Sequence, residues 1–205
     1  MDVIASNRLM DCHDRPEQRS AARYISLIRA AKLVSPSGEF VCVVRDVSSS
    51  GVKVKTFHRL PGGCDRISLE LQNGERFDLR PVRMDADEAS FTFTRPVAVE
   101  RLIREHWTHP KRQFRLAVTL PVRVLARGTQ WDGEIVNLSQ QGARLRLAAH
   151  LATDQLVRIA APRLPEIHAK VRWHRQEVYG VVFEDTFSLP QIARFAAQVQ
   201  CPGLL

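Results

Sequence analysis

The sequence predicts an all-β fold in which two similar units stand in tandem, each with six antiparallel strands followed by a short helix. Short apolar segments recur at even spacing with turn residues between them, which is typical of antiparallel sandwiches and barrels. In addition, one signature, (Asp/Asn)-x-Ser-x-x-Gly, begins at Asp46 and again at Asn137, 91 residues later. A chain of 205 residues is long enough for two units of this size.

In the first unit, six segments have the composition of strands. Gly51–Phe57 alternates valine with lysine, the period-2 pattern of a half-buried strand. Asn73-Gly74 is a strong signal for a two-residue hairpin turn. The expected strands are Tyr24–Val34, Glu39–Arg45, Gly51–Phe57, Ile67–Leu71, Arg76–Val82 and a segment that contains Phe91 and Phe93.

The second unit repeats this order of segments. Its first strand contains Pro121, which predicts a bend or an edge position because proline cannot donate to a strand ladder. The six expected strands are Leu116–Ala126, Trp131–Val136, Ala143–Leu147, Leu156–Ala160, Ile167–Trp173 and Tyr179–Phe183.

Each unit ends in a predicted helix that follows a proline, Pro96 or Pro190, and these prolines are 94 residues apart. Apolar residues then recur at i, i+3, i+4 and i+7, which places them along one helix face. The two stripes are Val99, Leu102, Ile103 and His106 in the first unit, and Ile192, Phe195, Ala196 and Val199 in the second.

The first residues of the chain are polar and charged, so we expect no signal peptide there. No stretch approaches the ~20 apolar residues of a spanning helix, so we expect no membrane-spanning segment. The four cysteines are scattered without zinc-like spacing, which favours a cytoplasmic protein. Cys42 lies in an apolar run and is expected to be a small buried residue. The resulting domain prediction is a flexible arm over 1–14, a first unit over 15–107 and a second unit over 108–205.

The formal net charge is +8, with an isoelectric point near 9.9. Excess positive charge attracts polyanions, so nucleic acid, nucleotides and anionic membranes are all candidate partners. Solubility alone is an equally ordinary reason for such a charge.

The first copy of the signature has the residue types of an anion and guanine site. Arg19 and Arg23 lie upstream, and each guanidinium can grip a phosphate or a guanine edge with two parallel hydrogen bonds. Asp46 can accept hydrogen bonds from guanine N–H groups. Ser48 can donate to a phosphate or cap the turn, and Gly51 permits a positive φ and close approach of a ligand. A plain Asx or Ser turn is the structural alternative, but the matched repeat argues against it.

With these residues quoted, the chain resembles the PilZ domain family. Arg-x-x-x-Arg followed by (Asp/Asn)-x-Ser-x-x-Gly is the motif of these bacterial receptors for cyclic di-GMP. The resemblance covers nearly the whole chain as two copies. It implies two tandem six-stranded antiparallel β-barrels, each followed by a short C-terminal α-helix, and cyclic di-GMP as the ligand, with no further cofactor.

The two copies differ in how well they match the family pattern. In the second copy, Lys111 stands where the first arginine belongs, and lysine cannot make the bidentate contact, although the adjacent Arg112 could compensate. However, its last strands contain Trp173 and Gly180, which the first copy lacks. The resemblance implies ligand-binding roles for Arg19, Arg23, Asp46, Ser48 and Gly51 in the first copy, and for Lys111, Arg112, Arg115, Asn137, Ser139 and Gly142 in the second. The first copy is therefore expected to be the main binding site, with the second as a further site or a docking partner.

The function expected from the sequence is a cytoplasmic receptor that converts cyclic di-GMP binding into a rearrangement between the units or of the N-terminal arm, read by a protein partner. The alternative is a basic, nucleic-acid-binding transcription regulator that responds to the nucleotide. It is favoured by the net charge and by Arg123, Arg127, Arg144 and Arg146 on predicted strands, and disfavoured by the lack of a helix-turn-helix pattern. A scaffold with two decayed sites is a third possibility.

Other patterns give weaker indications. We expect no enzyme, because the sequence has neither a nucleophile elbow nor a phosphate-binding loop. His106 and His109 lack the further ligands that a metal site needs. Trp107, Trp131 and Trp173 are expected to pack in the interior, although an exposed stacking surface is the alternative.

Overall fold

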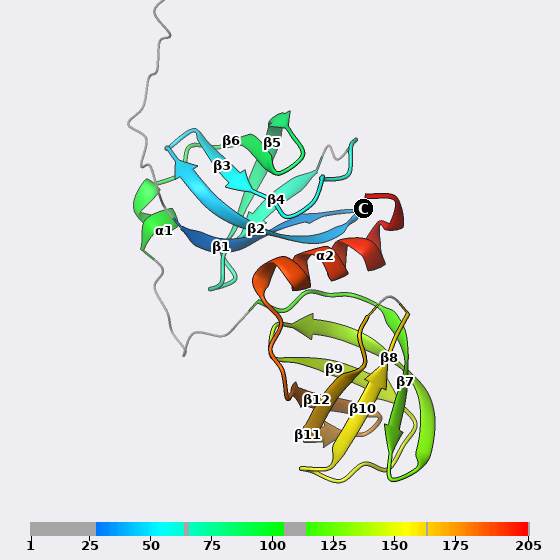
Figure 1. Ribbon diagram of the computed structural model, residues 1–205. Helices are drawn as coiled ribbons and strands as arrows, with labels where there is room; N and C mark the ends of the chain where they lie inside the picture. Colours follow the sequence, from blue (N-terminus) through cyan, green and yellow to red (C-terminus); the bar gives the residue numbers. More distant parts are fainter. Residues whose placement is uncertain (1–27, 64–65, 105–113, 163, 205) are drawn as a thin grey trace, which may run out of the picture.

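The computed structural model describes residues 28–63, 66–104, 114–162 and 164–204. It contains two closed six-stranded antiparallel barrels, so the predicted fold class is confirmed (Figure 1). We call them barrel 1 and barrel 2 in chain order. The predicted arm over 1–14 and the predicted boundary between 107 and 108 lie outside the described residues.

Barrel 1 is followed by one short helix. The helix, α1 (Val99–Ile103), has five residues, and Leu102 is its buried residue. His106, which the apolar stripe included, lies outside the described residues. The strands of barrel 1 are β1 (Arg29–Ser35), β2 (Gly38–Val47), β3 (Gly51–Lys55), β4 (Ile67–Glu70), β5 (Arg76–Met84) and β6 (Glu88–Phe93).

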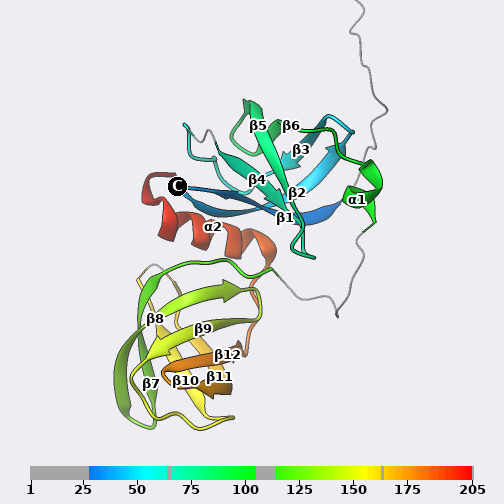
Figure 2. The same ribbon diagram turned by 180° about the vertical axis from the view of Figure 1, so that it is seen from behind.

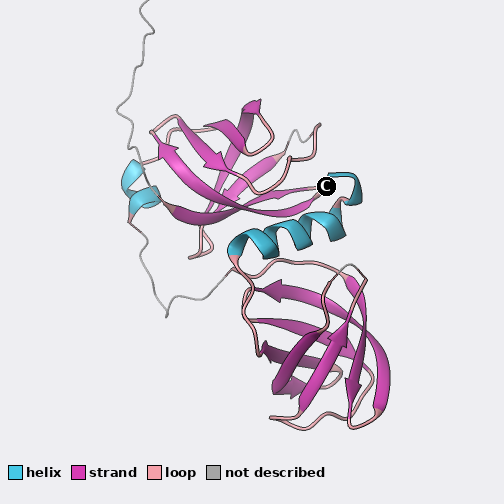
Figure 3. Ribbon diagram, in the orientation of Figure 1, coloured by secondary structure: helices cyan, strands magenta, loops and turns pink. Residues whose placement is uncertain are grey.

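Barrel 2 is followed by a longer helix, α2 (Leu189–Gln200), and a short 3-10 turn, η1 (Pro202–Leu204). The expected strand Leu116–Ala126 is shorter, because Leu116 forms an isolated bridge to Leu138 instead of joining the barrel. The strands are β7 (Leu120–Ala126), β8 (Thr129–Ser139), β9 (Gly142–Leu147), β10 (Leu156–Ala160), β11 (Ile167–Arg175) and β12 (Val178–Phe183). Figure 3 shows how strands dominate both units.

The two barrels have the same topology. Barrel 1 has the order β1-β2-β3-β6-β5-β4, and barrel 2 has the equivalent order β7-β8-β9-β12-β11-β10. Both have a bulge in the second strand, between Val44 and Asp46 and between Ile135 and Asn137. Closed barrels have no edges, so Pro121 is not at one. It instead lies at the start of β7, outside the part that pairs with β10.

Each barrel has its own apolar core, built from the inward positions of alternating strands. The longest departure from alternation on the strands of barrel 1 is Phe40–Val44 on β2, where every residue is buried. Phe40, Cys42 and Val44 point into the core of barrel 1, whereas Val41 packs into the cluster of barrel 2. This strand is therefore buried on both faces, which explains its continuous apolar sequence.

Helix α2 lies between the two barrels, as Figures 1 and 2 show from opposite sides. Its predicted stripe is partly wrong: the fully buried residues are Ile192, Ala193, Ala196 and Ala197, whereas Phe195 and Val199 are half-buried. Ile192, Ala193 and Ala196 join the cluster of barrel 2, and Ala197 joins that of barrel 1. A helix covered on two sides needs small residues at both contacts, and a single-stripe pattern does not anticipate this.

Polar contacts fix the end of α2 on barrel 1. The Gln200 side chain accepts a hydrogen bond from the Glu39 backbone N–H at 2.7 Å and donates one to the Glu39 carbonyl at 2.9 Å. At the other end, the backbone N–H of Ser188 donates to the Gln191 side chain at 2.8 Å, a half of a capping box. No helix within the described stretches has the length and apolar character of a membrane span.

His58 is a buried histidine in barrel 1, and it gives a prediction for stability. Burial lowers the pKa of His58 below its ordinary 6.5, and a hydrogen bond to the Arg59 carbonyl opposes this only in part. Between the two pKa values the unfolded chain binds more protons than the folded one. The stability that the neutral ring contributes is therefore complete above pH 6.5 and is lost as the pH falls through the folded-state pKa.

We expect the free energy of unfolding to fall between pH 7.5 and pH 5.5, as measured by urea denaturation, more steeply in the native chain than in His58→Gln. Other titrating groups contribute equally to both proteins, so the difference in slope reports His58. Equal slopes would contradict a neutral buried imidazole.

Candidate functional site

The second copy of the repeated signature lines a pocket on barrel 2. Its cavity has a volume of about 390 Å³, within the range of ligand pockets. Four of the expected site residues, Arg115, Asn137, Ser139 and Gly142, are brought together here. The remaining lining residues are Gln141, Ala143, Arg172, Trp173, Gly180, Val181 and Val182. Lys111 and Arg112 lie outside the described residues.

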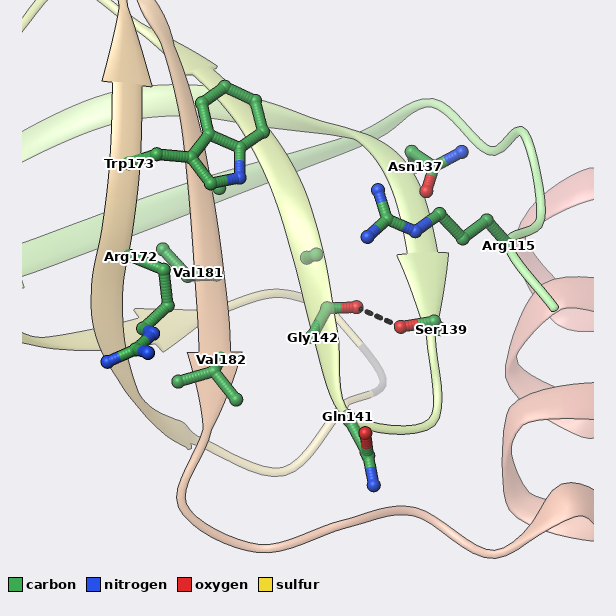
Figure 4. Close-up of a pocket in the computed structure, with 11 residues that line it drawn as sticks. Arg115, Asn137, Ser139, Gln141, Gly142, Arg172, Trp173, Val181 and Val182 are labelled. Carbon is green, nitrogen blue, oxygen red and sulfur yellow. Dashed lines mark hydrogen bonds between the residues drawn. The ribbon is translucent and has the colours of Figure 1, made fainter. Parts of the chain in front are cut away.

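The pocket is built on β8 and β9 and the strands beside them. A bulge at Val136 immediately precedes Asn137, which pairs with Arg144 in the ladder, and Ser139 ends β8. Arg115 comes from the segment before β7, and Figure 4 shows its guanidinium beside Asn137, across the site from Trp173 and Arg172. The site thus joins the segment before β7 to the outer surface of the barrel.

Serine caps the tight turn in both copies. The Ser139 hydroxyl donates to the Gly142 carbonyl at 3.0 Å (Figure 4). In barrel 1, the Ser48 hydroxyl accepts from the Gly51 N–H at 3.0 Å. Of the two roles expected for this serine, capping the turn is the one that these contacts fulfil.

The expectation of a positive φ at Gly51 is wrong. Gly51 and Gly142 are not among the residues with positive φ in the described chain. Each is required because a strand passes behind it: a Cβ at Gly142 would lie 2.2 Å from the Val181 carbonyl oxygen, and one at Gly51 would lie 2.7 Å from that of Phe91. The close approach that the glycine permits is thus to the protein's own backbone, and in barrel 2 it lets β9 and β12 pair closely where they line the pocket.

Trp173 was expected to pack in the interior, but its side chain forms part of the pocket and is 40% exposed. It pairs across the strands with Gly180, and a Cβ at that glycine would lie 2.1 Å from the indole. The guanidinium of Arg144 lies over the same ring, 5.8 Å from its centroid. By contrast, Trp131 packs against the core of barrel 2, as expected, and Trp107 lies outside the described residues.

The charge of the pocket is positive. Arg115 and Arg172 contribute guanidinium groups, and none of the eleven described lining residues is acidic. The guanidinium of Arg172 lies 3.4 Å from the exposed carboxylate of Asp154. Two guanidinium groups, an amide, a hydroxyl and an indole face suit a ligand with anionic groups and a flat aromatic base.

The equivalent surface of barrel 1 is different. Asp46, Ser48 and Gly51 lie as in the second copy, but Arg19 and Arg23 lie outside the described residues. Strand pairing puts Arg83 in the place of Trp173, and Ser90 in that of Gly180. The cations here are paired with acids: Lys53 with Glu88 at 2.7 Å, and Arg83 with Asp85 at 2.8 Å.

Sequence reasoning missed Arg172, Gln141 and Arg144 as residues in or beside the site. Arg172 occupies the bulge of β11 between Val171 and Trp173. Arg144 lies opposite both Asn137 and Gly180 in the ladders. A basic residue that alternates with apolar ones on a strand gives no sign of which strand lies beside it. For Arg144, the available signal was its position two residues after Gly142, the last residue of the signature.

Within the described residues, no group of three or more His, Cys, Asp or Glu side chains could hold a metal ion.

A positively charged pocket on a small barrel, lined by a repeated polar turn, defines a binding module for an anionic ligand.

The comparison with protein families identifies this module. Residues 110–200 match the family model of the PilZ domain. This part of the chain, which spans β7–β12 and α2, therefore matches the PilZ domain. No curated protein shows significant similarity to the chain.

Several solved structures resemble the chain at low identity. The Borreliella burgdorferi PlzA protein in complex with c-di-GMP is 12% identical, with a TM-score of 0.32, over 82% of this chain and 87% of that one. The Bacillus subtilis inhibitor of motility, MotI/DgrA, is 13% identical, with a TM-score of 0.37, over 87% and 98%. The K. pneumonia MrkH–c-di-GMP complex is 14% identical, with a TM-score of 0.33, over 82% and 84%.

Two glycines of the pocket should respond differently to substitution. Gly142→Ala forces its Cβ against the Val181 carbonyl, which is backbone, so we expect a loss of about 1–3 kcal/mol in the free energy of unfolding. Gly180→Ala displaces the Trp173 indole, a half-exposed side chain that can move. Here we expect a smaller loss but a shift in tryptophan fluorescence.

Urea denaturation and emission spectra would measure both effects. Gly62→Ala is the control, because open space surrounds that glycine. Equal destabilisation by the two pocket substitutions, with no spectral difference between them, would contradict the described packing of β9 and β12.

Proposed function

We propose that this protein is a cytoplasmic receptor for cyclic di-GMP and that the pocket of barrel 2 is its main binding site. The observation that carries the proposal is the pocket itself: Arg115 and three signature residues converge there with an exposed indole and a second arginine, and no acid is among the described lining residues. The family match over the same residues supports it.

The chemistry of the pocket suits this ligand. Cyclic di-GMP has two guanine bases and two anionic phosphodiester groups. Arg115 and Arg172 could each hold a phosphate or the O6/N7 edge of guanine with paired hydrogen bonds. The amide of Asn137 can both donate to and accept from a base, and the indole of Trp173 offers a stacking surface. By family resemblance, Lys111 and Arg112 would add positive charge to the same site.

This proposal reverses the order of the two sites that the sequence suggested. Arg19, Arg23, Asp46, Ser48 and Gly51 remain a predicted second site. Its weaker rank rests on the acids that already pair with Lys53 and Arg83. A phosphate there would have to compete with carboxylates for these cations.

We further propose that binding is read as a change between the barrels, and that the protein acts as a receptor and not as an enzyme. Arg115 lies on the segment that enters barrel 2 beside α2, and α2 packs on both barrels. A ligand that draws Arg115 inward would thereby act on the barrel contact. The shift can be no larger than the difference in ligand affinity between the two arrangements. A protein partner would read the new surface.

Replacement of Arg115 tests the assignment of the main site. Loss of a charge-assisted hydrogen bond typically costs about 1.5–3 kcal/mol, so Arg115→Ala should weaken cyclic di-GMP binding by about 10- to 100-fold in titration calorimetry. Arg123→Ala removes an exposed arginine of β7 that is not in the pocket, and it should bind as the native chain does. If Arg23→Ala causes the larger loss, barrel 1 holds the main site. If the native chain binds no cyclic di-GMP, the proposed function is wrong.

The nucleic-acid alternative has less support. Of the arginines that suggested it, Arg146 pairs with Glu134 at 2.5 Å, Arg123 lies opposite Asp132, and Arg144 lies over Trp173. Of the described helices, α1 has five residues and α2 is covered by both barrels, so neither is free to enter a major groove.

A salt series separates the two functions. We expect binding to a random DNA duplex to be weak at about 50 mM salt and to disappear by about 200 mM, because only dispersed surface charge drives it. Cyclic di-GMP binding should persist over this range. Fluorescence anisotropy with a labelled duplex measures the first and calorimetry the second. Duplex binding that persists at the higher salt would favour the transcription regulator.

A further inference from the structure

A buried charge cluster lies on barrel 1, away from both signature turns. Lys32 on β1 has a side chain that is only 8% exposed. Its Nζ lies 3.0 Å from Oε2 of Glu39 on β2 and 3.0 Å from Oε1 of Glu70 on β4. Both carboxylates are largely buried as well, at 16% and 14% exposure. Removing three charges from water is costly, and an apolar residue would often stabilise such a position as well.

The cluster makes two contacts with barrel 2, and both are to the segment that carries Arg115. Lys32 Nζ donates to the Arg115 carbonyl at 3.4 Å. Glu39 Oε2 accepts from the Ala117 backbone N–H at 2.9 Å. These backbone groups flank Leu116, which is fully buried and exchanges hydrogen bonds with Leu138 at 2.8 and 3.0 Å. Thus barrel 1 holds one side of this segment, and β8 of barrel 2 holds the other.

The held segment positions the arginine of the pocket. With its carbonyl fixed by Lys32 and the next residue fixed by Leu138, Arg115 has a defined backbone from which its side chain reaches toward Asn137 (Figure 4). Neither Lys32 nor Glu39 is a lining residue of the pocket. Their effect on a ligand would therefore be indirect, through the backbone of Arg115.

We propose that Lys32 and Glu39 are positioning residues of barrel 1 for the ligand site of barrel 2. The inference rests on the proposed function only for the identity of the ligand. This has a thermodynamic consequence, because coupling between two sites is reciprocal. If the contact of the cluster with barrel 2 strengthens ligand binding by some free energy, ligand binding strengthens that contact by the same amount. The buried charges are then the link by which barrel 1 senses occupancy of barrel 2.

The test is a double-mutant cycle in the full chain, with cyclic di-GMP as the probe in calorimetry. Lys32→Met keeps the length of the side chain and removes the charge, and we expect a loss of affinity of about tenfold. In the Arg115→Ala background the same substitution should cost less than about twofold, because the side chain that it positions is gone. Arg101→Met, which removes an exposed ion pair with Glu75 from α1, is the control and should leave affinity unchanged.

Equal losses in the two backgrounds would overturn the proposal, because a general loss of stability does not depend on Arg115. Lys32→Met removes the cation that pairs with Glu39, whereas Glu70 keeps its pair with Arg76, and the variant could fail to fold. Glu39→Gln is the second variant: it keeps an oxygen for the Ala117 N–H and weakens only the charge contact with Lys32. Its expected loss is about threefold, again absent without Arg115.

A measurement without ligand separates failure of this inference from failure of the proposed function. Hydrogen exchange of the Ala117 amide should be about tenfold faster in Glu39→Ala than in the native chain, because its acceptor is removed. Unchanged exchange would overturn the positioning role, whether or not cyclic di-GMP binds. Faster exchange in a chain that binds no cyclic di-GMP would support the positioning role and reject the ligand.

Discussion

The contact between β2 and α2 holds the arrangement of this molecule together. Strand β2 is buried on both faces, since Phe40, Cys42 and Val44 fill barrel 1 while Val41 packs into the cluster of barrel 2. Helix α2 presents alanines to both barrels. The side chain of Gln200 forms hydrogen bonds with both the backbone N–H and the carbonyl of Glu39. Fully burying one valine contributes about 1.5–3 kcal/mol, so several such residues make the contact a substantial part of the fold.

This contact also sets the place of the ligand site. The segment before β7 passes beside α2, and its backbone is held by Lys32 and Glu39 on one side and by Leu138 on the other. A receptor needs its binding site to be sensitive to something beyond the site. Here Arg115 stands on a described stretch that both barrels hold, which would give ligand binding a direct route to the arrangement of the barrels.

The two copies of the signature show how a repeat can diverge without loss of fold. Strand order, bulges and the serine-capped turn are the same in both. What differs is the surface beside the turn: barrel 2 has Trp173 over Gly180, whereas barrel 1 has Arg83 opposite Ser90, with its charge taken by Asp85. The fold needs the turn and the glycine against which the next strand packs, while the neighbouring strands shape the pocket surface, so these can change separately.

The sequence by itself determined the all-β class, the tandem repeat, the strands and the candidate residues of the second site, because alternation, turn residues and a matched signature are local patterns. It could not determine which copy has the better pocket, since Trp173, Arg172 and Arg144 join the site only when β8, β9, β12 and β11 lie side by side. Nor could it reveal the second buried face of α2 or the role of Lys32. Those depend on the packing of one barrel against the other, and contacts between residues so far apart in the chain leave no periodic pattern in the sequence.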